Sequence, residues 1–157
     1  MHIKLITIGK TNADFARVGT ELYMQRAAKY APVSIVELPD VKKKNKLKPE
    51  RLKEEEGKKI LEVLSPHSEL FLLDEKGKAL TSLKFADFLQ QKMNTGIKTL
   101  FLVVGGAYGF SDAVYARASG KISLSALTFP HDLVRVFIAE QIYRAFTILR
   151  GEPYHHE

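Results

Sequence analysis

The sequence contains no cysteine and no long apolar segment, and both absences narrow the classes of protein to consider. Without cysteine the chain has neither disulfide bonds nor thiol chemistry, which fits the cytosol, so we expect a cytoplasmic protein. No apolar run approaches the roughly 18 residues that span a bilayer, so we expect no membrane partner. The start, MHIKLITIGK, lacks the features of a secretory leader. Histidines are few and acidic residues scattered, so we expect no metal site.

Positive charge is what the sequence has in surplus. Its 24 lysines and arginines exceed the acidic residues, for a formal net charge of +6. Such a surplus favours polyanionic partners, because neutralising phosphates releases counterions. Residues 42–48, KKKNKLK, hold five lysines in seven positions. This run is either a solvated mobile loop or a nucleic-acid contact.

Apolar periodicity predicts strands that alternate with helices along the whole chain. We expect strands at residues 2–9, 33–38, 68–74, 99–104 and 121–127, with a turn at 75–80. Helices are expected at 12–30, 49–64, 82–94, for about two turns after Ser111, and from 130 to about 150, with Asn12, Ser82 and Ser111 as candidate caps. At 157 residues this pattern predicts a single α/β domain, residues 1–157, with a mainly parallel central sheet and helices on both faces.

Three strand ends carry the candidate ligand-binding residues. In open α/β sheets, ligands bind outside the carboxyl ends of the strands. Those ends are at residues 73–74, at Gly105 and Gly106, and at residues 125–129. The glycines are equally consistent with a simple tight turn. Their spacing matches neither a G-x-G-x-x-G fingerprint nor a phosphate-binding loop, which disfavours a dinucleotide or nucleoside triphosphate.

The final helix is apolar on nearly all sides, and several chemically active side chains flank it. Such a helix is buried on more than one side, either in a two-fold dimer, which we favour, or centrally within one chain. In its first turns, His131 is structural or catalytic, and Arg135 pairs with Asp132 or binds a phosphate or a substrate carbonyl. In the tail PYHH, Tyr154 and His155 are either unordered or contact a nucleotide base.

Three segments resemble a known family over essentially the whole chain. They are IKLITIGK, FLVVGGAYGFS and LSALTFPHDLVRVFIAEQIYRAFTILRGEPYHHE. Together they resemble the RlmH-type ribosomal RNA large subunit methyltransferases of the SPOUT superfamily, which are α/β enzymes with a C-terminal trefoil knot. The resemblance implies a homodimer that transfers a methyl group from S-adenosylmethionine to N3 of a pseudouridine in 23S rRNA, on assembled ribosomes.

The resemblance also implies where the reaction occurs. The cofactor would contact the three strand ends; the residues are Leu73, Gly105, Leu124, Ser125, Ala126, Leu127, Thr128 and Phe129. The active site would be completed by the partner's tail. As a mechanism, we expect His131 or His155 to accept the proton of the base, Arg135 to stabilise charge on its carbonyls, and Tyr154 to position its ring.

Two other functions fit the same sequence. A SPOUT enzyme with a different RNA substrate would keep the cofactor residues. A non-catalytic RNA-binding or ribosome-assembly protein would keep the fold but not bind S-adenosylmethionine. Binding of the cofactor, and methylation of ribosomes compared with free rRNA and tRNA, distinguish these possibilities.

Overall fold

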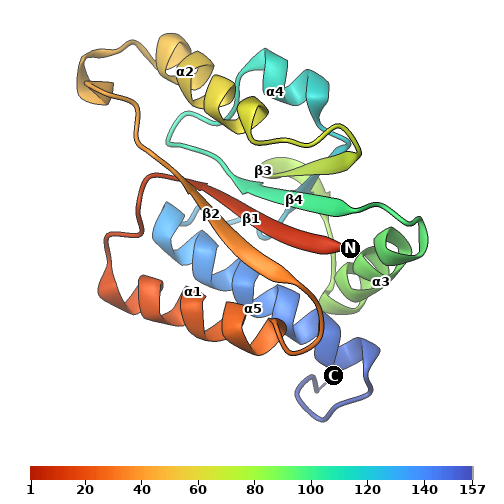
Figure 1. The fold of residues 1–157 in the computed structure, drawn as a ribbon. Coiled ribbons are helices and arrows are strands. Elements are labelled where there is room, and N and C mark those ends of the chain that lie inside the picture. Colours follow the sequence, from red (N-terminus) through yellow and green to blue (C-terminus); the bar gives the residue numbers. More distant parts are fainter. Residues whose placement is uncertain (157) are drawn as a thin grey trace.

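A five-stranded parallel sheet lies between two layers of helices in the computed structural model, which describes residues 1–156 (Figure 1). The sheet order is β2-β1-β4-β3-β5, and every neighbouring pair is parallel. The strands are β1 (His2–Ile8), β2 (Val33–Leu38), β3 (Ser68–Ala79), β4 (Thr99–Val104) and β5 (Gly120–Ser123). The helices are α1 (Asp14–Ala27), the short 3₁₀ helix η1 (Lys44–Lys46), α2 (Pro49–Glu62), α3 (Ser82–Asn94), α4 (Asp112–Arg117) and α5 (His131–Leu149).

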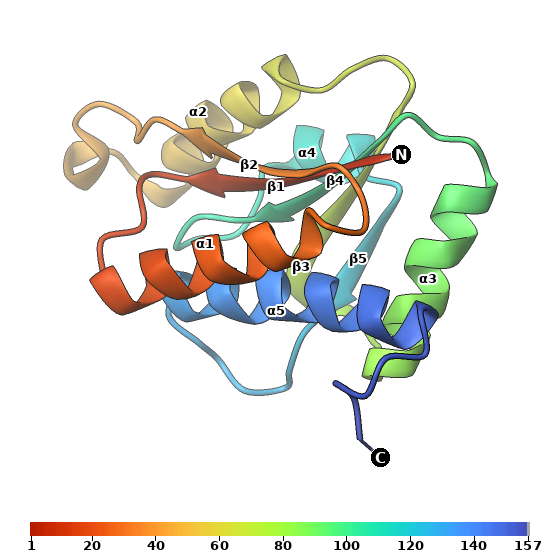
Figure 2. The same ribbon diagram turned by 60° about the horizontal axis from the view of Figure 1, so that its bottom comes forward.

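Each face of the sheet buries its own apolar core. On one face, Ile6 and Phe101 pack in a cluster with Ile60 of α2 and Val114 of α4. On the other face, the side chains of the sheet pack in a cluster with α1, α3 and α5. Figure 2 shows α1 and α5 side by side below the sheet. This arrangement confirms the predicted α/β architecture with helices on both faces. The predicted C-terminal knot stays a prediction.

The third strand is longer than predicted, and the expected turn at residues 75–80 is wrong. β3 continues to Ala79 because its second half also pairs with β5. Both Leu73 and Lys78 align with Ile122, so the register shifts between them. A β-carbon at Gly77 would lie 2.6 Å from the backbone of Ile122, so the two strands approach closely where glycine allows it. β5 ends at Ser123, so residues 124–127 form a loop instead of the predicted strand.

The predicted helix caps at Asn12 and Ser82 are also wrong, because other side chains take their place. The amide of Ala13, at the start of α1, donates to Asp132 Oδ2 at 3.1 Å, and Asn12 forms no cap. At the start of α3, the side chain of Thr81 accepts the capping bond, while Ser82 donates to Gln141 of α5. The start of α1 therefore depends on a residue distant in the sequence, whereas the cap of α3 is local. Ser111 occupies the predicted N-cap position of α4, but its side chain makes no capping bond.

The last helix is enclosed largely by its own chain. Ile138, Ala139 and Ile142 are fully buried, and α5 packs against both α1 and α3. This supports the central-helix alternative for most of its apolar surface. One side stays open, however, where Phe137 is 39% exposed. Within residues 1–156, no helix has the length and hydropathy of a membrane span.

Candidate functional site

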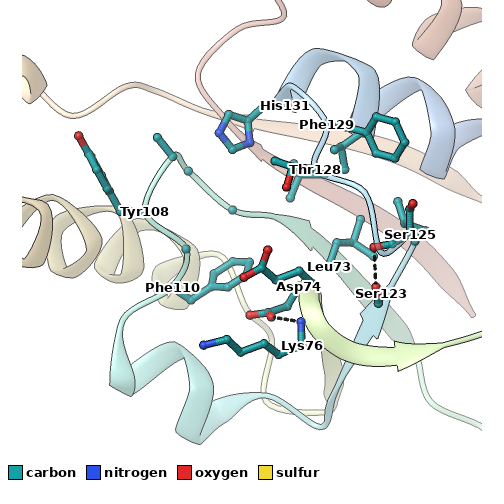
Figure 3. A pocket seen from close by; sticks show the side chains of 18 of the residues that line it. Leu73, Asp74, Lys76, Tyr108, Phe110, Ser123, Ser125, Thr128, Phe129 and His131 are labelled. Carbon is teal, nitrogen blue, oxygen red and sulfur yellow. Dashed lines mark hydrogen bonds between the residues drawn. The ribbon is translucent and has the colours of Figure 1, made fainter.

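A cavity of about 460 Å³ opens at the carboxyl ends of β4 and β5 and at the bend in β3 where its register shifts after Leu73 (Figure 3). Parallel strands bring these ends to one edge of the sheet, as the strand-end rule predicts. All but one of the eight predicted cofactor residues line this cavity; they are Leu73, Gly105, Leu124, Ser125, Leu127, Thr128 and Phe129. Ala126, in the same loop, is not among the lining residues described. The fold therefore brings together, in one cavity, predicted residues from three separate segments of the chain.

The loop at residues 124–129 owes its shape to its small hydroxyl residues. Ser123 Oγ donates to the carbonyl of Ser125 at 3.0 Å, and Ser125 Oγ accepts the amide proton of Leu127 at 2.9 Å. These bonds satisfy backbone groups that have just left the sheet. At the end of the loop, Phe129 packs edge-on against Phe137 of α5, with ring centroids 5.0 Å apart. The loop is thus held at both ends as a wall of the cavity.

The glycine-rich turn forms the opposite wall, and one glycine is required by close packing. A β-carbon at Gly105 would lie 2.8 Å from Phe110 Cζ, and Phe110 is buried. The turn closes with a hydrogen bond of 3.1 Å from the amide of Gly109 to the carbonyl of Gly106. Gly109 has a φ of +77°, a conformation that favours glycine. Backbone therefore lines the cavity here, as the sequence predicts for a ligand-approaching turn.

Asp74 forms a polar edge of the cavity at the bend in β3. Its carboxylate accepts a bond of 2.8 Å from the amide of Lys76 and one of 2.6 Å from the hydroxyl of Tyr115. Burial, together with this bond to Asp74, raises the pKa of Tyr115 to about 12, so the phenol stays protonated. Sequence reasoning missed Tyr115, Lys76 and Phe110 as cavity residues. Only the neighbourhood of the glycine turn hinted at Phe110.

His131 lies at the mouth of the cavity, on the first turn of α5 (Figure 3). Burial lowers the pKa of its imidazole, nearby Arg135 lowers it further, and Asp132 partly opposes them. The ring is therefore neutral at neutral pH. A neutral imidazole has one nitrogen free to accept a proton. The structure thus places the predicted histidine beside the predicted cofactor residues.

Arg135 is buried and bound to the end of β1. Its terminal nitrogens donate to the carbonyl of Ile8 at 2.6 Å, to that of Gly9 at 3.2 Å and to Thr11 Oγ1 at 2.8 Å. The side chain is only 4% exposed, and Asp132 is used to cap α1 instead of pairing with it. In this arrangement the guanidinium supports the chain around the site.

The tail residues lie at the other end of α5. Tyr154 donates to Glu140 at 3.1 Å, and His155 Nδ1 lies 3.3 Å from Arg144, which itself pairs with Glu140 at 2.6 Å. Burial is the main cause that raises the pKa of Tyr154. The 19 residues of α5 extend over roughly 28 Å at about 1.5 Å per residue. A single chain therefore does not bring Tyr154 and His155 to His131.

Within residues 1–156, no group of three or more histidine, aspartate or glutamate side chains is arranged to hold a metal ion. The polar groups of the cavity wall are hydroxyls, backbone, the carboxylates of Asp74 and Glu75, the ammonium of Lys76 and the imidazole of His131, and Asp74 is already bonded to its neighbours. These groups suit an organic ligand of moderate polarity.

Comparisons with known proteins agree on one family. The family model described as "Predicted SPOUT methyltransferase" matches residues 1–155. Proteins of Flavobacterium johnsoniae and Parabacteroides distasonis are 48% and 50% identical to this chain over 157 residues, with full coverage of both partners in each pair. Both are named Ribosomal RNA large subunit methyltransferase H.

The solved structures that the comparison found are more distant in sequence. A putative methyltransferase of Legionella pneumophila, in complex with the cofactor SAM, has 13% sequence identity and a TM-score of 0.45. The matched region covers 90% of this chain and 65% of the Legionella pneumophila chain. The SpoU methyltransferase AviRb of Streptomyces viridochromogenes has 14% identity and a TM-score of 0.46, covering 96% of this chain and 61% of its own.

Proposed function

Since this chain belongs to the SPOUT methyltransferase family, we propose that it methylates N3 of a pseudouridine in 23S rRNA. The methyl donor in this proposal is S-adenosylmethionine, and the substrate is the assembled ribosome in the cytoplasm. The observation that carries it is one cavity formed by three distant segments and lined by seven of the eight residues that the family resemblance implies for the cofactor. The names of full-length relatives point to the same substrate class.

The cavity fits the proposed cofactor in size and lining. Its volume of about 460 Å³ lies within the range of small-molecule sites. Leu73, Leu124 and Phe129 offer apolar surface for a purine ring, and the turn at Gly105 lets backbone approach it. S-adenosylmethionine would supply a methyl group already activated by its positive sulfur. The protein then has to orient the two reactants and accept the proton of the base.

Gly105→Val is predicted to abolish cofactor binding. The added side chain would overlap Phe110, which is buried and lines the cavity, so the ring or the turn would have to shift. Isothermal titration calorimetry should show an affinity for S-adenosylmethionine at least about 100-fold weaker than that of the wild type. Circular dichroism controls for folding. If the wild-type protein does not bind S-adenosylmethionine either, the non-catalytic alternative is favoured.

His131 is the proposed proton acceptor within the chain, with His155 of the partner as the alternative. Because the pKa of His131 is lowered, the ring becomes protonated only below its usual value of about 6.5. Single-turnover methylation should therefore fall as the pH drops from about 6.5 toward 5, and His131→Gln should be slower by about 10²–10⁴-fold with this acidic limb removed. An unchanged rate and pH profile would exclude this role.

Protonation of His131 also affects stability, in a direction that can be worked out. A lowered folded-state pKa means that the unfolded chain binds the proton more readily. The protein should therefore lose stability as the pH falls through about 6.5, and His131→Gln should lose less over the same interval. Exposed His67 provides the matched control, since His67→Gln should change neither the rate nor the pH profile.

A homodimer is the proposed functional form. Phe15, Val18 and Leu22 of α1 are 64%, 54% and 42% exposed, and Phe137 of the neighbouring α5 is 39% exposed. Exposed apolar side chains that gather on neighbouring helices are typical of interaction surfaces. A two-fold partner on this surface would also explain how a tail at the far end of α5 serves a site at its near end. Tyr154 and His155 would then act in the partner's site.

For Arg135 we propose a positioning role in place of direct contact with the base. Its bonds to the carbonyls of Ile8 and Gly9 join the start of α5 to the end of β1. These bonds hold His131 in position, because His131 and Arg135 lie one turn apart on α5. Removing the guanidinium would leave those carbonyls without their donor and loosen the histidine.

A further inference from the structure

A second cavity of about 330 Å³ lies across the glycine-rich turn from the first. Its walls come from the end of β1, the lysine-rich loop, α2 and the start of α5. The two cavities share five lining residues, namely Gly105, Gly106, Ala107, Tyr108 and His131. A molecule in the second cavity would therefore be separated from the cofactor site only by the turn and the histidine.

Glu56 of α2 is the unusual group in this second cavity. It is only 7% exposed and lines the cavity, and its carboxyl lies against Gly106, where a β-carbon would overlap it. Within residues 1–156 it takes part in no hydrogen bond and no ion pair, since Lys44 is paired instead with Asp40 at 2.7 Å. Burial raises the pKa of Glu56, and Lys44 opposes this effect. A largely buried carboxyl that faces a cavity and has no partner in the chain can accept a hydrogen bond from a ligand there.

We propose that the second cavity receives the acceptor base and that Glu56 recognises the N1–H group that distinguishes pseudouridine from uridine. This inference rests on the proposed function. In uridine, N1 carries the ribose and has no proton, whereas the carbon–carbon glycosidic bond of pseudouridine leaves N1–H free as a donor. N1 and N3 flank the same carbonyl carbon. A base whose N3 faces the cofactor can therefore still present N1–H to a second group.

The surroundings of Glu56 suit an unstacked nucleotide. Tyr108, on the shared turn, is 56% exposed and offers an aromatic face, on which bases stack in RNA complexes. Lys10 and Lys44 line the cavity, and the lysine-rich run at residues 42–48 continues from its rim. Cationic side chains that line the site of a bound base can contact the phosphates that flank it. In this proposal the lysine-rich run, whose role the sequence leaves open, contacts the phosphates beside the bound base.

The test compares ribosomes that carry pseudouridine with ribosomes that carry uridine at the target position. The wild-type protein should methylate pseudouridine at least about tenfold faster, the effect expected of one hydrogen bond to a charged group. Glu56→Leu should bring the two rates to within about twofold by slowing only the reaction on pseudouridine. Glu56→Gln, which keeps the size and one acceptor oxygen, should give an intermediate ratio.

Two controls keep the result specific to recognition of the base. Affinity for S-adenosylmethionine should stay unchanged in both Glu56 variants, which shows that they are folded. Glu62→Gln, on the exposed end of the same helix, should keep the wild-type ratio. A wild-type ratio in Glu56→Leu, or no preference in the wild-type protein, would overturn the inference and leave the methyltransferase proposal standing. No transfer to either ribosome by wild-type protein would overturn both.

Discussion

Val18→Glu is expected to convert the protein to a monomer and to reduce methyl transfer by more than about 100-fold. Val18 lies on α1 between Phe15 and Leu22, at the centre of the exposed apolar surface. A two-fold axis would bury two new carboxylates in one interface, and unpaired buried charge is strongly unfavourable. Because the tail residues would lose their partner's site, the rate should fall even where each chain stays folded.

Analytical ultracentrifugation at micromolar concentration, together with a methylation assay on ribosomes, measures both effects. Val63→Glu is the matched control: Val63 is 38% exposed, but it lies at the end of α2, on the opposite side of the sheet. That variant should stay dimeric and active. A wild-type protein that sediments as a monomer would contradict the dimer, and a monomeric but fully active Val18→Glu variant would contradict the composite site.

Mixing two inactive variants is expected to restore about a quarter of the wild-type activity. One variant is Gly105→Val, which lacks the cofactor cavity but keeps its tail. The other combines Tyr154→Ala and His155→Ala, and keeps the cavity. Random exchange makes about half of the dimers mixed, and each mixed dimer has one intact cavity facing one intact tail from the other chain.

The restored activity depends on which chain supplies the tail, so this experiment separates two models. If Tyr154 and His155 acted within their own chain, no mixed dimer would contain a complete site and the mixture would stay inactive. Each variant incubated alone under the same exchange conditions provides the background rate. The roughly 28 Å length of α5 between His131 and the tail makes the partner model the expected one.

Much of the fold, and many of the residues that line the first cavity, could be predicted from the sequence, because both depend on local pattern. Alternating apolar strands and helices identified the layers, and the strand-end rule selected Leu73, Gly105 and the loop after β5. The predictions that were wrong concern features that depend on contacts between residues distant in the sequence. β3 runs past its apolar segment because β5 offers a second register, and α1 is capped by Asp132 of the last helix. In both cases the contacting residues lie too far apart in the sequence for a local pattern to connect them.

The second cavity shows the same limit for function. Glu56 sits in the run EEE, which reads as the acidic first half of a surface helix. Its neighbour Glu55 is in fact partly exposed and paired with Arg51 and Lys58. Only packing of α2 against the glycine-rich turn buries Glu56. Helical periodicity fixed which residues share a face, but not that this face would meet the turn of another segment.

The most direct test of the central claim is methylation of ribosomes from a strain that lacks the gene for this protein. Purified protein and S-adenosylmethionine are added, and the 23S rRNA is digested and analysed by mass spectrometry. The account predicts one added methyl group, on N3 of a single pseudouridine that is unmethylated in the deletion strain. Absence of transfer, or a methyl group on any other nucleotide or on tRNA instead, would contradict it.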